Sequence, residues 1–271
     1  MVRKIVKYSI LFVVLVFLYA PIVLLAIYSF NASTVMGNWS KTWTFDLYRQ
    51  LFADKELLTI VANTLVLAVL SAILSTILGT LGAIGIFYSK KKVKSTLTTV
   101  TNIPVINADI VTAISIALVC SMFLFGRTYA SLLIGHVVLC FPFVVLNVLP
   151  KLKQMNPNIY EAGLDLGATP TRALFTIIIP QIIPGIFSGF LMAITLSLDD
   201  YIVTTFTKPS TFDTISTYVY NAYAKGGKNT SVPALRALST IIFAVMIIVI
   251  LVANIRANKK AKEDKLKRRG I

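Results

Sequence analysis

Charged residues, cysteine and histidine are scarce in this chain of 271 residues. Only 14% of the residues are charged while 56% are hydrophobic, whereas a soluble domain carries about a quarter charged residues. This shortage excludes an ordinary soluble domain and indicates a polytopic, all-α membrane protein. The two cysteines, Cys120 and Cys140, lie inside apolar runs, which points to neither a disulfide framework nor a metal site. The single histidine, His136, is also in an apolar run, where we expect a hydrogen-bonded packing residue rather than a proton relay.

Acidic residues number only 11 against 26 Lys and Arg, and the excess is unevenly distributed. Eight basic residues fall within 256–271, and four more, Lys90, Lys91, Lys92 and Lys94, separate two apolar runs. This is the pattern of cytoplasmic loops, which attract anionic headgroups. Nucleic-acid binding would favour a soluble segment in which basic and aromatic residues alternate on one face, and the sequence has none. We therefore expect these charges to contact membrane lipid and not nucleic acid.

Six apolar windows are long enough to cross about 30 Å of hydrocarbon. The first has 23 residues, too many for a signal-peptide core, so we expect it to be retained. Six spans place both termini on one side. That side carries 18 Lys and Arg against 8 on the other, which predicts cytoplasmic termini. We predict one transmembrane domain, 1–271, with a core at about 57–255, a basic cytoplasmic tail at 256–271, and spans at 8–30, 58–88, 97–125, 129–149, 183–206 and 234–255.

The second predicted span carries small residues at regular spacing. Ser71, Ser75 and Gly79 recur every four residues, and Ala72, Thr76 and Thr80 lie beside them. A helix face of such small side chains allows close approach of another helix. We therefore expect this face to pack against a neighbouring span.

A polar insert at 156–180 separates the fourth and fifth predicted spans and is cytoplasmic in this topology. A helix that begins at Asn156 or Asn158, around Pro157, is expected to end at Gly167. Thr169 and Pro170 are a favourable cap and first-turn pair for a second short helix, which we expect to end at Pro180. The insert is thus predicted to be two short helices joined by a glycine turn.

The insert resembles the EAA loop of binding-protein-dependent ABC importer permeases. Its Glu-Ala-Gly at 161–163, Gly167, Ile177 and Ile-Pro at 179–180 keep the family's spacing, with Gly163 and Ile179 in place of Ala and Leu. The resemblance implies the six-helix type I ABC importer (MetI-like) fold, with coupling helices that dock on a separate ATPase subunit. The residues implied in ATPase coupling are Glu161, Ala162, Gly163, Asp165, Gly167, Arg172, Ile177 and Pro180.

Nearly the whole chain resembles the permease subunits of spermidine/putrescine importers. The segments that carry this resemblance are 19–22 (YAPI), 29–33 (SFNAS), 109–115 (DIVTAIS), 141–145 (FPFVV) and 196–200 (LSLDD). It implies a multi-pass protein of the bacterial cytoplasmic membrane that pairs with a second, similar permease, a homodimeric ATPase and an extracellular polyamine-binding protein. The sequence has no Gly-x4-Gly-Lys-Ser/Thr phosphate loop. We therefore expect a non-catalytic subunit without a cofactor, while the ATPase partner uses ATP and Mg.

Three carboxylates in apolar runs favour a cationic substrate. An aspartate at a helix centre costs about 2.5–3.5 kcal/mol to insert, so Asp109, Asp199 and Asp200 are candidate pathway residues, with Tyr201 and Phe206 as aromatic faces for ammonium groups.

Structural roles for these carboxylates remain open. Asp199 and Asp200 lie toward the outer interface, where either can pair with Arg236, and on one helix they point about 100° apart. Asp109 can cap a broken helix. The family commonly has proline before this aspartate; here Ala108 occupies that position and the nearest proline is Pro104, so we expect the break to shift by about one turn.

Two alternatives to a polyamine importer follow from the same residues. One is a permease of this architecture for thiamine, iron or another small cation. The other is a secondary transporter acting alone, which would need an inverted repeat or its own ion-coupling site. The two halves of the sequence have no obvious repeat.

Overall fold

The computed structural model describes residues 2–33, 38–123, 126–156, 158–224, 233–245 and 247–248. All regular elements within these residues are helices, and one isolated antiparallel bridge joins Asn31 to Trp43. The predicted all-α class is therefore confirmed. The chain forms two compact units, Met1–Leu58 with Ala222–Ile271 and Thr59–Asn221, each with its own packing.

The first unit contains α1 (Val2–Ser29), α2 (Asp46–Ala53) and an unlabelled helix, Pro233–Val245. The apolar span Tyr8–Ser29 of α1 buries none of its residues within the chain. Beyond it the chain folds back, and the buried Asn31 amide donates to the Ser40 carbonyl and accepts from the Ser40 amide. Arg236 Nη1 donates to the Ser33 carbonyl at 2.9 Å, and its guanidinium lies 6.0 Å from the Tyr28 ring centre.

Four helical stretches in the described residues are long and apolar enough to cross a membrane: Tyr8–Ser29, Lys55–Tyr88, Tyr129–Gln154 and Pro170–Asp199. The third predicted span is instead a pair of helices, α4 (Lys91–Ile106) and α5 (Asp109–Phe123), bent by 106°. The helix Pro233–Val245 stands where the sixth span is predicted, but it is shorter. The remainder of that span and the basic tail at 256–271 lie outside the described residues. The predicted count of six spans is therefore not confirmed.

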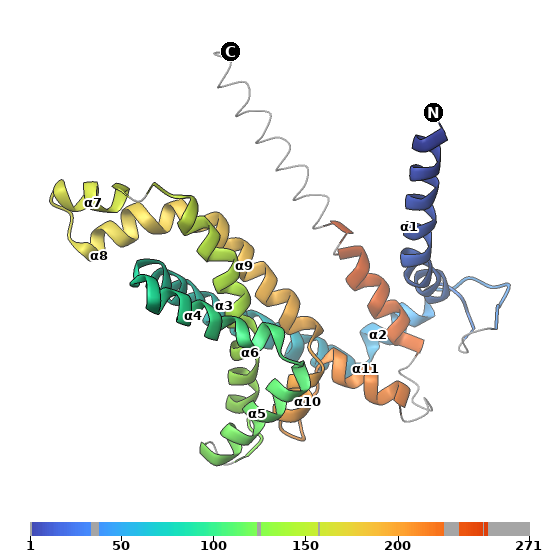
Figure 1. Ribbon diagram of the computed structural model, residues 1–271. Helices are drawn as coiled ribbons and strands as arrows, with labels where there is room; N and C mark the ends of the chain where they lie inside the picture. Colours follow the sequence, from blue (N-terminus) through green and yellow to red (C-terminus); the bar gives the residue numbers. More distant parts are fainter. Residues whose placement is uncertain are drawn as a thin grey trace. The chain divides into compact units, whose positions relative to one another are not determined.

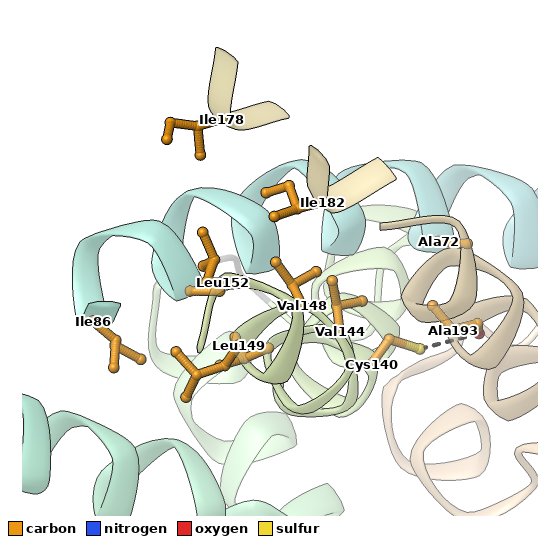
Figure 2. Close-up of a cluster of buried hydrophobic side chains, with 12 residues drawn as sticks. Ala72, Ile86, Cys140, Val144, Val148, Leu149, Leu152, Ile178, Ile182 and Ala193 are labelled. Atoms are coloured by element: carbon orange, nitrogen blue, oxygen red, sulfur yellow. Dashed lines mark hydrogen bonds between the residues drawn. The ribbon is translucent and has the colours of Figure 1, made fainter. Parts of the chain in front are cut away.

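The core of the second unit lies between α3 (Lys55–Tyr88), α6 (Tyr129–Gln154) and α9 (Ile179–Asp199) (Figure 1). Figure 2 shows the buried side chains of this cluster, with Ala72 and Ile86 from α3 at its two ends and Val144 and Val148 of α6 in the middle. Full burial of a valine or leucine side chain contributes roughly 1.5–3 kcal/mol. In a membrane, where lipid is equally apolar, tight packing contributes instead. This core holds the helices whose ends carry the polar residues.

The predicted small-residue face of α3 packs on α6, as expected. Ser71, Ala72 and Ser75 are fully buried. A Cβ placed on Gly79 would lie 2.7 Å from Val144 Cβ, closer than real atoms approach. The glycine therefore permits a helix-to-helix distance that no larger residue allows.

The second helix of the insert does not end at Pro180, contrary to the prediction. The chain runs without interruption from α8 (Pro170–Ala173) through a π-helical turn, η1 (Leu174–Ile178), into α9. Proline lacks an N–H and its ring crowds the carbonyl four residues earlier. The wider π turn, in which the Ile179 amide donates to the Leu174 carbonyl, stands directly before Pro180 and relieves this crowding. The helix thus begins before the predicted fifth span, 183–206, and it ends earlier, at Asp199.

The break between α4 and α5 lies at Asn107 and Ala108, directly before Asp109. Pro104 is inside α4, so the expected shift of the break by about one turn is wrong. Asn107 has an extended backbone, and its side chain donates to Thr112 Oγ1 at 3.3 Å across the break. Asn107 therefore ends α4, although Ala108 replaces the expected proline.

Candidate functional site

The glycine turn of the insert follows α7 (Asn158–Asp165). Gly167 has a φ of +85°, a left-handed conformation that side chains disfavour. The Ala168 amide donates to the Gly163 carbonyl at 3.1 Å and the Gly167 amide to the Leu164 carbonyl at 2.9 Å. These two bonds form a Schellman motif, which satisfies the last carbonyls of the helix. The predicted glycine stop is confirmed, and its geometry requires glycine.

Two residues of the EAA-like motif contact each other across the turn. Gly163 is buried against η1, and a Cβ placed there would clash with the Cδ1 atom of Ile177 and approach Ala173 at 3.9 Å. The motif spacing therefore corresponds to a physical contact that folds α7 onto η1. Tyr160 fixes the other side of α7, because its ring lies 5.3 Å from that of Tyr88 at the end of α3.

The remaining predicted coupling residues face outward. Glu161, Ala162, Asp165, Arg172 and Pro180 are exposed. Two large apolar side chains that the sequence analysis missed share this exposure: Leu166 is 90% and Phe175 is 61% exposed. The signal was present, because both are large apolar residues in a polar insert. Such a mixture of apolar side chains and charges suits a protein partner.

The chain breaks at Asp200 and Tyr201 instead of continuing one helix to Phe206. Asp199 is the last residue of α9, and Asp200 is extended with φ −67° and ψ 124°. The Asp200 carboxylate accepts from the amides of Val203 and Thr204, at 3.2 and 2.7 Å, and so caps α10 (Ile202–Thr207). The two carboxylates therefore do not lie on a common helix, and the expectation based on helical phase is wrong.

His136 lies at the centre of a buried hydrogen-bond chain. Its Nδ1 is 2.8 Å from Ser197 Oγ and its Nε2 is 2.9 Å from Thr204 Oγ1. Ser71 Oγ donates to Ser197 Oγ at 2.9 Å, and Thr204 Oγ1 donates to Asp200 Oδ2 at 2.8 Å. The chain thereby joins α3, α6, α9 and α10. The expected hydrogen-bonded role of His136 is confirmed, but its link to Asp200 was missed because nothing in the sequence aligns the two positions.

The other candidate pathway residues are dispersed. Asp199 is exposed at the end of α9. Tyr201 stacks on Tyr220, with ring centres 4.4 Å apart. Phe206 lines a pocket of about 350 Å³ with residues of α5 and with Arg127. Asp109 is exposed at the first position of α5, and no side-chain hydrogen bond to a helix amide involves it among the described residues. The structure thus joins Asp200 to His136 and leaves Asp109, Asp199 and Phe206 apart.

The charged neighbours of Asp200 and the groups that could bind a metal ion complete the description of the site. The Asp200 side chain is 7% exposed, and its Oδ2 lies 3.7 Å from His136 Nε2. The Asp200 carboxylate accepts from two amides of α10, and Arg236, in the first unit, donates to the Ser33 carbonyl. A pairing of Asp199 or Asp200 with Arg236 therefore stays a prediction. Within the described ranges, no group of three or more His, Cys, Asp or Glu residues could hold a metal ion.

Comparisons with solved structures indicate the fold. The chain is similar to a subunit of a bacterial ABC transporter involved in the import of the acidic polysaccharide alginate, with a TM-score of 0.68, 20% identity and coverage of 92% of this chain and 94% of that one. An amino acid ABC transporter with histidines is more distant, with a TM-score of 0.51 and 17% identity over 75% of this chain and 94% of that one. At these identities the similarity supports the fold alone.

Curated relatives cover most of the chain. It is 28% identical over 262 residues to the spermidine/putrescine transport system permease protein PotC of Escherichia coli K12, with 97% of both chains covered. It is 32% identical over 243 residues to the putrescine transport system permease protein PotI of the same strain, covering 86% of this chain and 84% of PotI. Residues 75–258 match the binding-protein-dependent transport system inner membrane components. The chain belongs to this family of inner membrane transport components.

Proposed function

We propose that this chain is the permease subunit of an ATP-driven importer of spermidine or putrescine in a bacterial cytoplasmic membrane. The observation that carries the proposal is the similarity of almost the entire chain to PotC and of 86% of it to PotI. The sequence independently supports a cationic substrate, because carboxylates in apolar segments are costly unless they serve a charged partner. The proposed assembly adds a second permease, a homodimeric ATPase and an extracellular binding protein.

The proposed ATPase contact is the outward face of the segment from α7 through α8 to η1. It offers Glu161 and Asp165 for charge pairing, and Leu166 and Phe175 as apolar anchors. Apolar anchors surrounded by polar residues are typical of protein interfaces. The contact of Gly163 with Ile177 ties this face to η1, which continues into α9. A displacement of the insert by the ATPase would therefore move a membrane helix directly.

The proposed substrate path runs along one side of α9. The buried side contains Gly185, Gly189, Ala193 and Ser197. The opposite side is exposed and includes Leu191, Thr195 and Asp199 at four-residue spacing. A carboxylate facing lipid would be costly, so this side is better matched to a second permease and to a polycation passing between the two. Asp199 then replaces part of the water lost by an ammonium group.

The orientation with both termini in the cytoplasm belongs to the same proposal. It follows from the distribution of Lys and Arg, and it places α7 and α8 on the side where ATP is available. The chain itself is proposed to be non-catalytic and to bind no cofactor. ATP and Mg would be used by the ATPase partner.

ATP-dependent uptake by the reconstituted complex tests the function. The chain would be purified with its neighbouring gene products and placed in proteoliposomes with ATP inside and the binding protein outside. Labelled spermidine and putrescine should accumulate only with ATP, while a Walker-lysine variant of the ATPase serves as the inactive control. Uptake of thiamine or iron in place of both polyamines would reassign the substrate. Uptake without the ATPase would indicate a secondary transporter and contradict the proposal.

A further inference from the structure

A continuous line of buried polar side chains crosses the second unit from α3 to α10. Ser71, Ser197, His136 and Thr204 are each 2% exposed or less. Neighbouring members lie 2.8–2.9 Å apart, and the line ends on the carboxylate of Asp200. Buried polar groups are retained where they are hydrogen-bonded, and a partly satisfied network is worse than an apolar one. In this line each member has a partner.

Counting donors fixes the direction of the bonds around His136. The single hydroxyl hydrogen of Thr204 is donated to Asp200, so Thr204 must accept from His136 Nε2–H. Because Nδ1 then carries no hydrogen, Ser197 donates to it, and the Ser71 hydroxyl, which also lies 3.1 Å from the Ala68 carbonyl, donates to Ser197. A neutral imidazole with the proton on Nε2 satisfies every position. The histidine therefore contacts α9 through Nδ1 and α10 through Nε2.

The same bonds hold α10 against α6. A Cβ on Gly135 would lie 2.8 Å from Val203 Cγ1, so the glycine brings α10 close enough for His136 to reach Thr204. Ser131 Oγ donates to the Thr207 carbonyl at 2.9 Å one turn away. On the other side of the break, Ser216 Oγ donates to the Asp200 carbonyl at 2.6 Å. Asp200 is thereby fixed from three directions.

We infer that His136 is a positioning residue for substrate recognition, acting through Thr204 to fix Asp200 and the break that orients Asp199 and Tyr201. This inference rests on the proposed polyamine import for its substrate. The Asp200 carboxylate already accepts from two amides and from the Thr204 hydroxyl that His136 fixes, so it serves the break. Asp199, exposed on the opposite side of α9 from Ser197, is the carboxylate available to an ammonium group.

Two substitutions distinguish the contact made by Nδ1 of His136 from the contact made by Nε2. In His136→Gln the side-chain amide nitrogen reaches the position of Nε2 and can still donate to Thr204. In His136→Asn the amide oxygen takes the position of Nδ1 and keeps only the Ser197 contact. We expect His136→Asn and Thr204→Val to raise the KM for spermidine about tenfold, with His136→Gln within about threefold of wild type and the maximal rate changed less than about twofold. Thr205→Val is the matched control, because Thr205 donates within its own segment to the Tyr201 carbonyl.

Uptake by proteoliposomes containing the whole complex decides the inference. Selective loss in His136→Asn and Thr204→Val, with His136→Gln and Thr205→Val near wild type, supports it. Equal KM values in His136→Asn and His136→Gln overturn it, because the Thr204 contact would then be irrelevant. A fall in maximal rate at unchanged KM, together with a lower melting temperature, also overturns it and leaves His136 a packing residue.

A substrate-independent measurement separates this inference from the proposed function. Melting temperatures of the purified complex are measured for His136→Asn, Thr204→Val and the double variant. The double variant should melt close to the single variants, since either change alone breaks the contact. Additive shifts overturn the link. If the wild-type complex takes up no polyamine, the proposed function fails, and the thermal cycle still supports or overturns the contact between His136 and Thr204.

Discussion

The insert at 156–180 and the break at Asp200 are both polar interruptions between apolar helices, yet they are built in opposite ways. In the insert, backbone bonds around Gly167 form the turn, and Glu161 and Leu166 are exposed. At the break, the Asp200 side chain caps α10 and accepts from Thr204, which in turn contacts His136 of another helix. The first region is defined by sequence neighbours, and the second depends on contacts between distant helices.

This difference indicates that the insert presents side chains to another protein, whereas the break holds its side chains in fixed positions. A turn that satisfies its own backbone leaves its side chains available to another protein. A turn held by buried polar side chains has fewer groups available and a more restricted geometry. We therefore expect substitutions in the insert to disturb coupling with little effect on substrate affinity, and substitutions around the break to have the reverse effect.

Gly167→Val tests the backbone turn and should have the largest effect. A β-branched residue at a φ of +85° is strained by roughly 1–3 kcal/mol, so the turn would open and displace the outward face. We expect uptake to fall by more than about tenfold while the chain still inserts. Gly167→Asn is the control, because asparagine tolerates this conformation better. Normal substrate-stimulated ATPase activity in Gly167→Val would contradict a coupling role.

Asp199→Asn tests the open carboxylate. A hydrogen bond between charged groups contributes about 1.5–3 kcal/mol, so its loss should raise the KM for spermidine about tenfold or more. Asp199→Glu keeps the charge and should retain most of the affinity. Initial rates of uptake over a range of spermidine concentrations provide the measurement. An unchanged KM in Asp199→Asn would remove this residue from the path.

Gly135→Ala tests the approach of α10 to α6. The added methyl group would meet Val203 at 2.8 Å, and such overpacking costs about 1–3 kcal/mol. We expect a melting temperature lower by several degrees and a moderately raised KM. Gly85→Ala is the matched control, since a Cβ there meets nothing within 4 Å and alanine favours helix. Equal melting temperatures for the two variants would contradict a close contact between Gly135 of α6 and Val203 of α10.

Gly163→Ala should have the smallest effect. Its new methyl group meets the Cδ1 atom of Ile177, the far end of a flexible side chain, which can move aside. We expect uptake to fall by about twofold at unchanged KM, and Ile177→Val in the same chain to restore it by removing that methyl group. Equal uptake by the single and double variants, both below wild type, would indicate that the loss does not arise from this contact.

Local signals in the sequence predicted the insert better than the break. The glycine stop at Gly167 and the cap at Thr169 depend on nearby residues, and both are present. Pro180 was misjudged because a π turn, which has no simple sequence pattern, lets the helix continue. The break in the third predicted span was expected but placed about one turn too early, at Pro104 instead of Asn107. The break of the fifth predicted span at Asp200 was missed because apolar content does not distinguish one helix from two.

The sequence alone determined that this is an all-α membrane protein, that its insert has the EAA spacing, and that Ser71 and Gly79 lie on a packing face. These features follow from composition and short-range periodicity, which are written along the chain. The tertiary structure decided which aspartate is held and which is open. That depends on the positions of His136 and Thr204, which are 68 residues apart in sequence and come within 2.9 Å only when α10 packs on α6.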